Sequence, residues 1–302
     1  KQQIFDFFGK TFWAHQFEDM HVLQGKIESM LELLEEWEFL KSNTNHNDFE
    51  SADNLKDEKY EATRVGKRVA ELYLDPYTAH QLILGMQRAT RMKVPTISFL
   101  HLLSSTLEIR PQLRVTAKDH DDVNEAVNKV EHALLEKEPS LYDAEYDDFL
   151  NAMKTALFFL DWIDENTEEN LLEKYNIRPG EVRTKIDIAD WLCYCCIELT
   201  KLMSLPKLSS HMQKLRIRIT NGVKEELIPL LKLKGIGRAR GRKLHKNSIR
   251  TLGDIKKIEI MNLVQILGKA TAISVKKQVG QDFDKLKIKE NKRKGQISLK
   301  DF

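Results

Sequence analysis

The sequence lacks the features of a membrane or secreted protein. Its longest apolar runs stay well short of the roughly 20 residues that span a bilayer, so we expect no transmembrane helix and no membrane partner. The segment from Lys1 to Phe8 also lacks the long apolar region of a signal peptide. The chain begins with Lys1 instead of Met, which indicates a fragment or a processed product.

Cysteine is equally scarce. The three cysteines of the 302 residues lie close together, at Cys193, Cys195 and Cys196. A disulfide framework would spread them along the chain, and the C-x-x-C spacing of Cys193 and Cys196 has no second pair to complete a zinc site. We interpret all three as small apolar residues inside a helix. Reduced thiols indicate a cytoplasmic protein.

Residue patterns for catalysis and metal binding are missing as well. The nine histidines contain no H-x-x-x-H pair, so we expect no metal site. A phosphate-binding ATPase loop needs G-x-x-x-x-G-K-[ST]. Gly235 and Gly241 are instead separated by five residues and followed by Arg242 and Lys243. We therefore expect no catalytic residue, no ATPase site and no cofactor in this chain.

The charge of the chain is distributed unevenly. From Lys224 to Phe302 there are 21 Lys and Arg against 8 Asp and Glu, a formal charge of +13. The remainder has 27 against 38, a charge of −11, so the overall value of +2 conceals a basic C-terminal quarter. Such segregation is typical of polyanion binding, although a solvated charged face gives the same count.

The sequence Gly235-Ile236-Gly237 predicts a tight turn that runs into a cationic helix. Glycine adopts the positive φ that such a turn needs, and the amides at a helix N-terminus favour an anion. Apolar residues flank the turn as in a helix-hairpin-helix unit, at Leu231, Leu233 and Leu244. We expect the amides at Gly235 and Gly237 to hold a phosphate, assisted by Arg238, Arg240, Arg242 and Lys243. Binding of another protein is the alternative, and the charge balance favours DNA.

The order of the predicted elements indicates a mainly α chain of several domains. Residues 1–75 make a winged helix, with helices at 4–16, from 22 and at 64–74, and strands at 37–40 and 59–63. Residues 76–221 have helical periodicity punctuated by prolines, which predicts a helical bundle. Residues 222–280 predict the helix-hairpin-helix domain, with a weaker second copy around Leu267-Gly268. Residues 281–302 form a basic linker, predicted to be disordered, with a short hydrophobic end.

The predicted helix over 180–203 carries a second candidate site. Trp191 lies in its middle, and Arg183 and Lys185 lie in its first turns. A tryptophan at such a position packs in a core or provides a platform on which a base stacks. Its position alone favours the core.

Several separated motifs follow one another in an informative order. They are Tyr60 to Pro76, Leu100 to Leu103, Tyr146 to Leu150, Lys154 to Leu157, Ala189 to Leu192, Gly222 to Leu227 and Ile236 to Leu244. Together they resemble the C-terminal part of archaeal HelQ-type, Ski-like superfamily 2 DNA repair helicases. The resemblance covers roughly residues 1–280. It implies a winged helix, a helical "ratchet" domain and a helix-hairpin-helix domain, without the family's two RecA-like motor domains.

The resemblance also implies a function. Such a helicase unwinds forked or single-stranded DNA in the 3′-to-5′ direction during replication-coupled repair, and its motor domains bind ATP and Mg²⁺. Trp191 corresponds to a ratchet-helix tryptophan that stacks on a base, which reverses the core preference. The C-terminal domain would grip the emerging strand. One departure concerns Thr184, which stands where the family often has a basic residue, between Arg183 and Lys185.

The C-terminal end carries a separate motif. Gln296, Leu299 and Phe302 follow Q-x-x-L-x-x-F, which is similar to the motif that binds the sliding clamp PCNA, although short motifs also arise by chance. An alternative function is therefore a stand-alone DNA-binding adaptor that recruits partners to the clamp. A transcription regulator is disfavoured, because the helix that would read DNA is acidic at Glu28, Glu32, Glu35 and Glu36. In either function we expect a nucleoid-associated protein.

Overall fold

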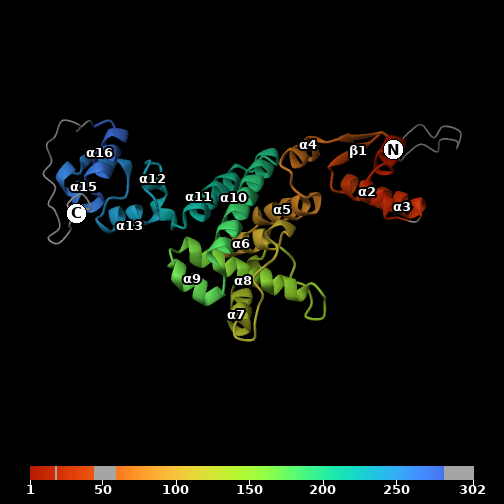
Figure 1. Cartoon of the computed structure of the whole chain (residues 1–302), viewed down its shortest axis with the longest axis horizontal. Coiled ribbons are helices and arrows are strands. Elements are labelled where there is room, and N and C mark those ends of the chain that lie inside the picture. The colour runs from red at the N-terminus through yellow and green to blue at the C-terminus, as the bar shows by residue number, and fades with distance from the viewer. Residues whose placement is uncertain (18, 44–58, 282–302) are drawn as a thin grey trace, which may run out of the picture. The chain divides into compact units, whose positions relative to one another are not determined.

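The computed structural model of the chain describes residues 1–17, 19–43 and 59–281 (Figure 1). The described residues are mainly helical and contain a single sheet of two strands, which confirms the predicted fold class. The chain forms two compact units, Lys1–Ala156 with Trp191–Gln213 and Leu157–Asp190 with Lys214–Phe302. Among the described helices, none has the length and apolar character needed to span a membrane.

The first part of the chain combines helices with a short antiparallel hairpin. Strands β1 (Leu40–Ser42) and β2 (Tyr60–Ala62) pair with Leu40 opposite Ala62. The helices are α1 (Gln2–Phe8), α2 (Phe12–His15), α3 (Met20–Glu36) and α4 (Arg64–Glu71). A small apolar core of Ala14, Leu23, Ile27 and Leu31 packs against apolar residues of α1 and of both strands. This order agrees with the predicted one, and the winged-helix identity stays a prediction.

Three element boundaries differ from those predicted. The helix over 4–16 is two helices, because the chain turns after Phe8 and Thr11 caps a new helix by accepting the Ala14 amide. The first strand begins at Leu40, since Glu38 has a left-handed φ of 59°. Helix α4 ends at Glu71, ahead of Tyr73, whose φ of 55° cannot continue a helix.

The middle of the chain is a set of longer helices. They are α5 (Pro76–Ala89), α6 (Thr96–Ser104), α7 (His120–Val130), α8 (Tyr146–Ile163), α9 (Glu168–Tyr175), α10 (Pro179–Leu202) and α11 (Pro206–Asn221). The prolines that punctuate residues 76–221 do not all end helices. Proline is also favoured in the first helical turn, and Pro76, Pro179 and Pro206 each begin a helix.

The cysteines of α10 behave as predicted. Cys193, Cys195 and Cys196 are free and fully buried. Burial raises the pKa of the Cys196 thiol well above its ordinary value, which keeps it protonated and unreactive. Their interpretation as small apolar core residues is confirmed.

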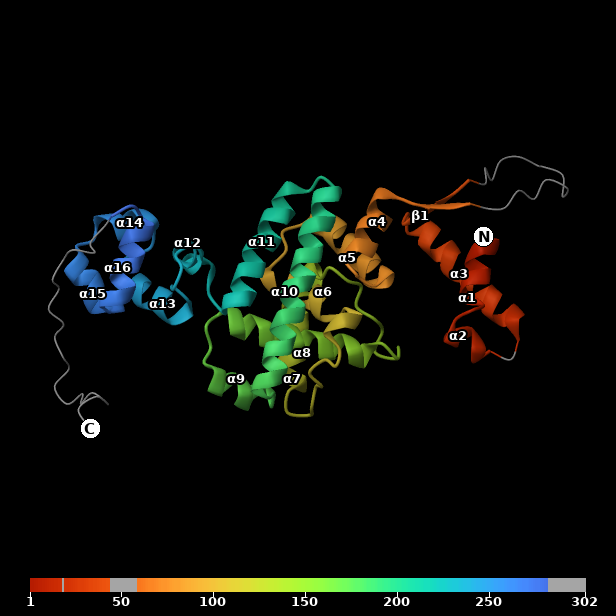
Figure 2. The same ribbon diagram turned by 45° about the horizontal axis from the view of Figure 1, so that its top comes forward.

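The C-terminal helices gather into one cluster (Figure 2). After a 3₁₀ turn at Glu225–Leu227 come α12 (Ile228–Leu231), α13 (Arg238–Lys246), α14 (Leu252–Lys257), α15 (Ile260–Leu267) and α16 (Lys269–Gln278). Leu233 and Leu244, which flank the glycine turn, are buried in their shared core. Lys276 is also buried, and its ammonium donates to the carbonyls of Lys256 and Ile258 at 3.1 and 2.5 Å.

Candidate nucleic-acid interface

The glycine turn has the predicted backbone geometry and leads directly into α13. Gly235 has a φ of +86°, and Gly237 is the extended N-cap residue of the helix. A Cβ added at either glycine would meet nothing within 4 Å, so the turn is open to a ligand. A side chain caps α14, where Thr251 accepts the Asp254 amide, but no described side chain caps α13. The first amides of α13 are therefore available to an anion.

Two of the predicted cations face outward beside this turn. Arg240 is exposed and its Nη1 donates to the carbonyl oxygen of Gly235 at 2.8 Å, which ties the helix to the turn. Lys243 is exposed one turn further along α13. These two side chains and the open amides make a compact cationic surface, which is suited to phosphate without selecting a base.

Arg242, by contrast, is engaged by carboxylates of the protein. Its Nε and Nη2 donate to the two oxygens of Glu165 at 2.6 Å each, and its Nη1 donates to Glu226 at 2.6 Å. Burial alone would raise the pKa of Glu165, but the hydrogen bonds from Arg242 and the Lys224 amide hold it below its ordinary value. A phosphate contact from Arg242 would require these ion pairs to open.

Arg238 is half-buried against an aromatic ring. Its guanidinium carbon lies 5.2 Å from the centroid of the Trp162 ring, a cation–π contact, and its Nη2 donates to the carbonyl of Asn166. Burial lowers the pKa of Arg238 from its ordinary value, although an arginine stays charged at neutral pH. This side chain therefore joins the start of α13 to the end of α8.

Trp162 and Glu165 were not predicted as parts of the site. Trp162 Nε1 donates to the carbonyl of Ile219 at 2.7 Å. Gly222, with a φ of +60°, lies so close that an added Cβ would be 2.7 Å from two ring carbons. Glu165 accepts the Lys224 amide at 3.1 Å and has a left-handed φ of 70°. The only signal in the sequence for these contacts was Gly222, which lies within one of the motifs on which the family resemblance rests.

A second turn repeats part of this geometry. Gly268 has a φ of +82°, precedes α16 directly, and has open space around its missing Cβ. No side chain within the described ranges caps α16. The first amides of α16 are thus arranged like those of α13, at the position where the sequence indicated a weaker second copy.

The residues predicted on α10 differ in their accessibility. Trp191 is partly exposed, and Arg183 is exposed and pairs through Nε with Asp187 Oδ2 at 3.0 Å. Lys185 is only 7% exposed, and burial lowers its pKa. Thr184 is exposed, with its hydroxyl donating to the Gly180 carbonyl. Of the two cations beside Thr184, only Arg183 lies where a ligand could reach it.

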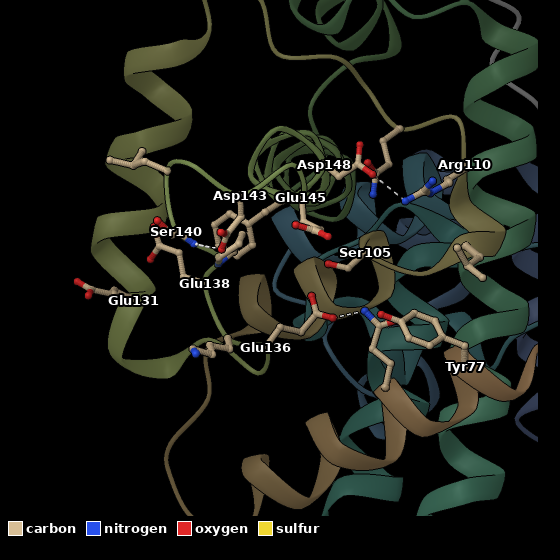
Figure 3. A pocket seen from close by; sticks show the side chains of 17 residues that line it. Tyr77, Ser105, Arg110, Glu131, Glu136, Glu138, Ser140, Asp143, Glu145 and Asp148 are labelled. Carbon is tan, nitrogen blue, oxygen red and sulfur yellow. Dashed lines mark hydrogen bonds and ion pairs between the residues drawn. The ribbon is translucent and has the colours of Figure 1, made fainter. Parts of the chain in front are cut away.

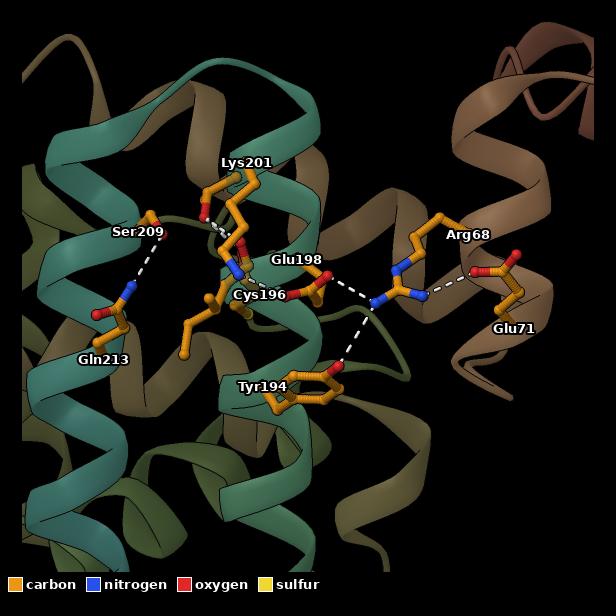
Figure 4. A network of polar contacts seen from close by, with 10 residues as sticks. Arg68, Glu71, Tyr194, Cys196, Glu198, Lys201, Ser209 and Gln213 are labelled. Atoms are coloured by element: carbon orange, nitrogen blue, oxygen red, sulfur yellow. Dashed lines mark hydrogen bonds and ion pairs between the residues drawn. The ribbon is translucent and has the colours of Figure 1, made fainter.

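Helix α4 contacts α10 through the side chain of Arg68 (Figure 4). Arg68 Nη2 donates to Glu198 Oε2 at 2.6 Å and to the Tyr194 hydroxyl at 3.4 Å, while Nη1 donates to Glu71 at 2.7 Å. Lys201 also donates to Glu198, at 2.7 Å. Tyr194 and Glu198 therefore hold α4 in place, while Trp191 on the same helix stays partly exposed.

A pocket in the first unit has the wrong charge for DNA (Figure 3). This pocket of about 930 Å³ is lined by six acidic residues, Glu131, Glu136, Glu138, Asp143, Glu145 and Asp148. Arg110 and Lys137 are its basic lining residues, and Arg110 pairs with Asp148 at 2.8 Å.

Within the described part of the chain, no group of His, Cys, Asp or Glu is arranged to hold a metal ion. The clamp-like motif at Gln296, Leu299 and Phe302 lies outside the described residues.

The family model and the three relatives described next are all named as helicases. Residues 97–222 match the family model described as archaeal helicase, domain 4. A protein of Thermococcus kodakarensis is 31% identical over 301 residues, which cover 98% of this chain and 25% of the relative. A protein of Methanocaldococcus jannaschii is 33% identical over 283 residues, with coverages of 93% and 21%. A protein of Pyrococcus horikoshii is 29% identical over 308 residues, with coverages of 98% and 39%. Each of the three relatives is named ATP-dependent DNA helicase Hel308, and the chain spans between about a fifth and two fifths of their lengths.

Proposed function

Because this chain is the counterpart of the C-terminal part of archaeal superfamily 2 DNA repair helicases, we propose that it grips the strand that such a helicase translocates. The observation that carries the proposal is the open, uncapped start of α13 behind Gly235, set in a segment with a charge of +13. The turn amides, Arg240 and Lys243 bind backbone phosphates and do not read sequence.

In this proposal Trp191 provides the second contact with the DNA strand. Its partly exposed ring offers a stacking surface that any base can use, and Arg183 lies on the same helix. Lys185 contributes through packing, because its side chain is buried. Phosphate contacts at α13 together with stacking at Trp191 would hold a moving strand without preference for its sequence.

The catalytic step belongs to motor domains that this chain does not contain. In the proposed whole enzyme these domains bind ATP and Mg²⁺ and drive 3′-to-5′ unwinding of forked DNA during replication-coupled repair. Exposed apolar side chains on the first helices offer them a docking face, at Phe7, Phe12, Val22 and Met30. Clamp binding through Gln296, Leu299 and Phe302 belongs to the same proposal, as does a cytoplasmic location at the nucleoid.

A salt series on the isolated chain tests the proposal. Anisotropy of a labelled dT₂₀ strand should show affinity falling steeply between about 50 and 200 mM salt, because neutralised phosphates release counterions. Lys243→Ala should reduce the log–log slope by about 0.7, the value of one phosphate contact on a single strand. Lys129→Ala is the matched control, since that exposed lysine pairs with Glu125 on α7. Binding that does not change with salt would contradict the proposed function.

A further inference from the structure

A second pocket, within the unit that contains α13, holds about 400 Å³. It lies among the end of α8, helix α9, the start of α10, the end of α11 and the first residue of α13. Its volume is within the range of pockets that take small organic groups. Two of its lining residues, Arg183 and Arg238, were predicted to bind DNA, but the pocket itself was not foreseen.

The walls of this pocket are largely apolar. Leu171 and Leu172 come from α9, and Val182 and Ile186 come from α10, with Pro179 and the Trp162 ring beside them. Such walls match the faces of a planar ring. Thr220 and Asn221 also line the pocket. The Thr220 hydroxyl donates to Asp190 and the Asn221 amide donates to the Ile217 carbonyl, so their oxygens are the groups that can accept from the polar edge of a ligand.

The charged residues of the lining are Arg183, Arg238 and the carboxylate Glu168, so the cations outnumber the carboxylate by two to one. Arg238 is also the first residue of α13, so one residue borders both the pocket and the open amides of the helix. Arg183 uses Nε for its ion pair with Asp187, and a guanidinium has further N–H donors. A ligand that combines an apolar ring with a phosphate would satisfy the walls and the arginines together.

We propose that this pocket receives one nucleobase of the strand whose phosphates contact the start of α13. The inference rests on the proposed function, and it adds a third kind of contact, insertion of a base. An apolar peptide side chain would fill the walls equally well, but it would bring no phosphate to Arg183 and Arg238. A nucleotide brings both chemical groups in one residue.

Filling the pocket tests the proposal in the full chain. Leu172 is partly exposed in α9, so Leu172→Trp can place an indole in the pocket without replacing a buried core residue. We expect dT₂₀ to bind about 10-fold more weakly, the size of one lost base contact, with an unchanged salt slope because the phosphate contacts remain. Asn170→Trp is the matched control, since Asn170 is exposed on α9 and does not line the pocket.

Cross-linking gives a test that needs no variant. A dT₂₀ strand carrying 5-iodouracil, irradiated in complex with the unaltered chain, should cross-link to Trp162 or its neighbours in α9 and α10, as mapped by mass spectrometry. Cross-links confined to Trp191 and α13, or a folded Leu172→Trp variant with unaltered affinity, would overturn the base pocket. Salt-insensitive binding of the unaltered chain would instead overturn the proposed function, so the two failures are distinguishable.

Discussion

Arg242 and Glu165 form a bidentate ion pair, with both hydrogen bonds at 2.6 Å, between residues 77 positions apart in the sequence. The sequence predicted a DNA contact for this arginine, and in the structure its guanidinium is paired with carboxylates of the protein. The pair fixes α13 against the turn after α8, which helps to hold the open helix start in place. The carboxylates of Glu165 and Glu226 also compete with phosphate for the Arg242 guanidinium.

Glu165→Ala should therefore have opposite effects on binding and stability. Release of Arg242 adds a cation beside α13, so we expect dT₂₀ to bind about threefold more tightly at low salt. Loss of this partly buried pair should lower the free energy of unfolding by about 2 kcal/mol. Anisotropy and urea denaturation measure the two quantities. Glu226→Ala is the control for stability, because Glu226 is more exposed and should contribute less than about 1 kcal/mol.

Trp191→Ala and Trp162→Ala separate a tryptophan that contributes to binding alone from one that also supports the fold. Trp191 is partly exposed, so its loss should weaken dT₂₀ binding about 10-fold with little change in melting temperature. Trp162 is 9% exposed, and its loss should cost about 3–5 kcal/mol of stability. Binding and thermal melts of both variants give the comparison. A large drop in melting temperature for Trp191→Ala would restore its interpretation as a core residue.

Gly222→Ala should destabilise the unit that contains α13. A Cβ there would lie 2.7 Å from the Trp162 ring, and the φ of +60° is strained for alanine. We expect a loss of about 3 kcal/mol in the free energy of unfolding, measured by urea denaturation. Gly180→Ala is the matched control, since Gly180 has open space in the first turn of α10. An equal loss in both variants would contradict the role assigned to the ring contact.

Acid should remove the stability that Asp119 contributes. Burial alone would raise the pKa of Asp119, but hydrogen bonds from Lys154, at 2.6 Å, and from Thr116 lower it from 3.8 to about 2. Because the folded-state pKa lies below the unfolded value, the contribution is complete above about pH 4 and is lost as the pH falls towards 2. Urea denaturation of the unaltered chain and of Asp119→Asn should thus differ at pH 5 and converge near pH 2. In a Lys154→Met background this pH-dependent difference should largely disappear.

Local patterns predicted much of the fold. Helix α13 begins directly after the predicted glycine turn, and β2 lies within the predicted strand. The start of α11 at Pro206 could not be predicted, because the same residue type begins some helices and ends others. Boundaries at Glu38 and Tyr73 depend on left-handed residues other than glycine, which leave no clear mark in the sequence.

Fewer features of the candidate site could be predicted from the sequence. Gly235 and the outward-facing Arg240 and Lys243 follow from a contiguous motif. The burial of Lys185 and the ion pair of Arg242 depend on which helix packs against each side chain. Contacts of that kind join distant parts of the chain, and no spacing rule within one segment contains them.

The missing cap of α13 has a further consequence. A capping side chain stabilises a helix by about 1 kcal/mol, and Thr251 supplies that to α14 while no described side chain supplies it to α13. A phosphate bound at the open amides would cap α13 in place of the absent side chain. Bound DNA would therefore stabilise the unit that contains α13. Occupancy by DNA and the melting temperature of this unit should then rise together.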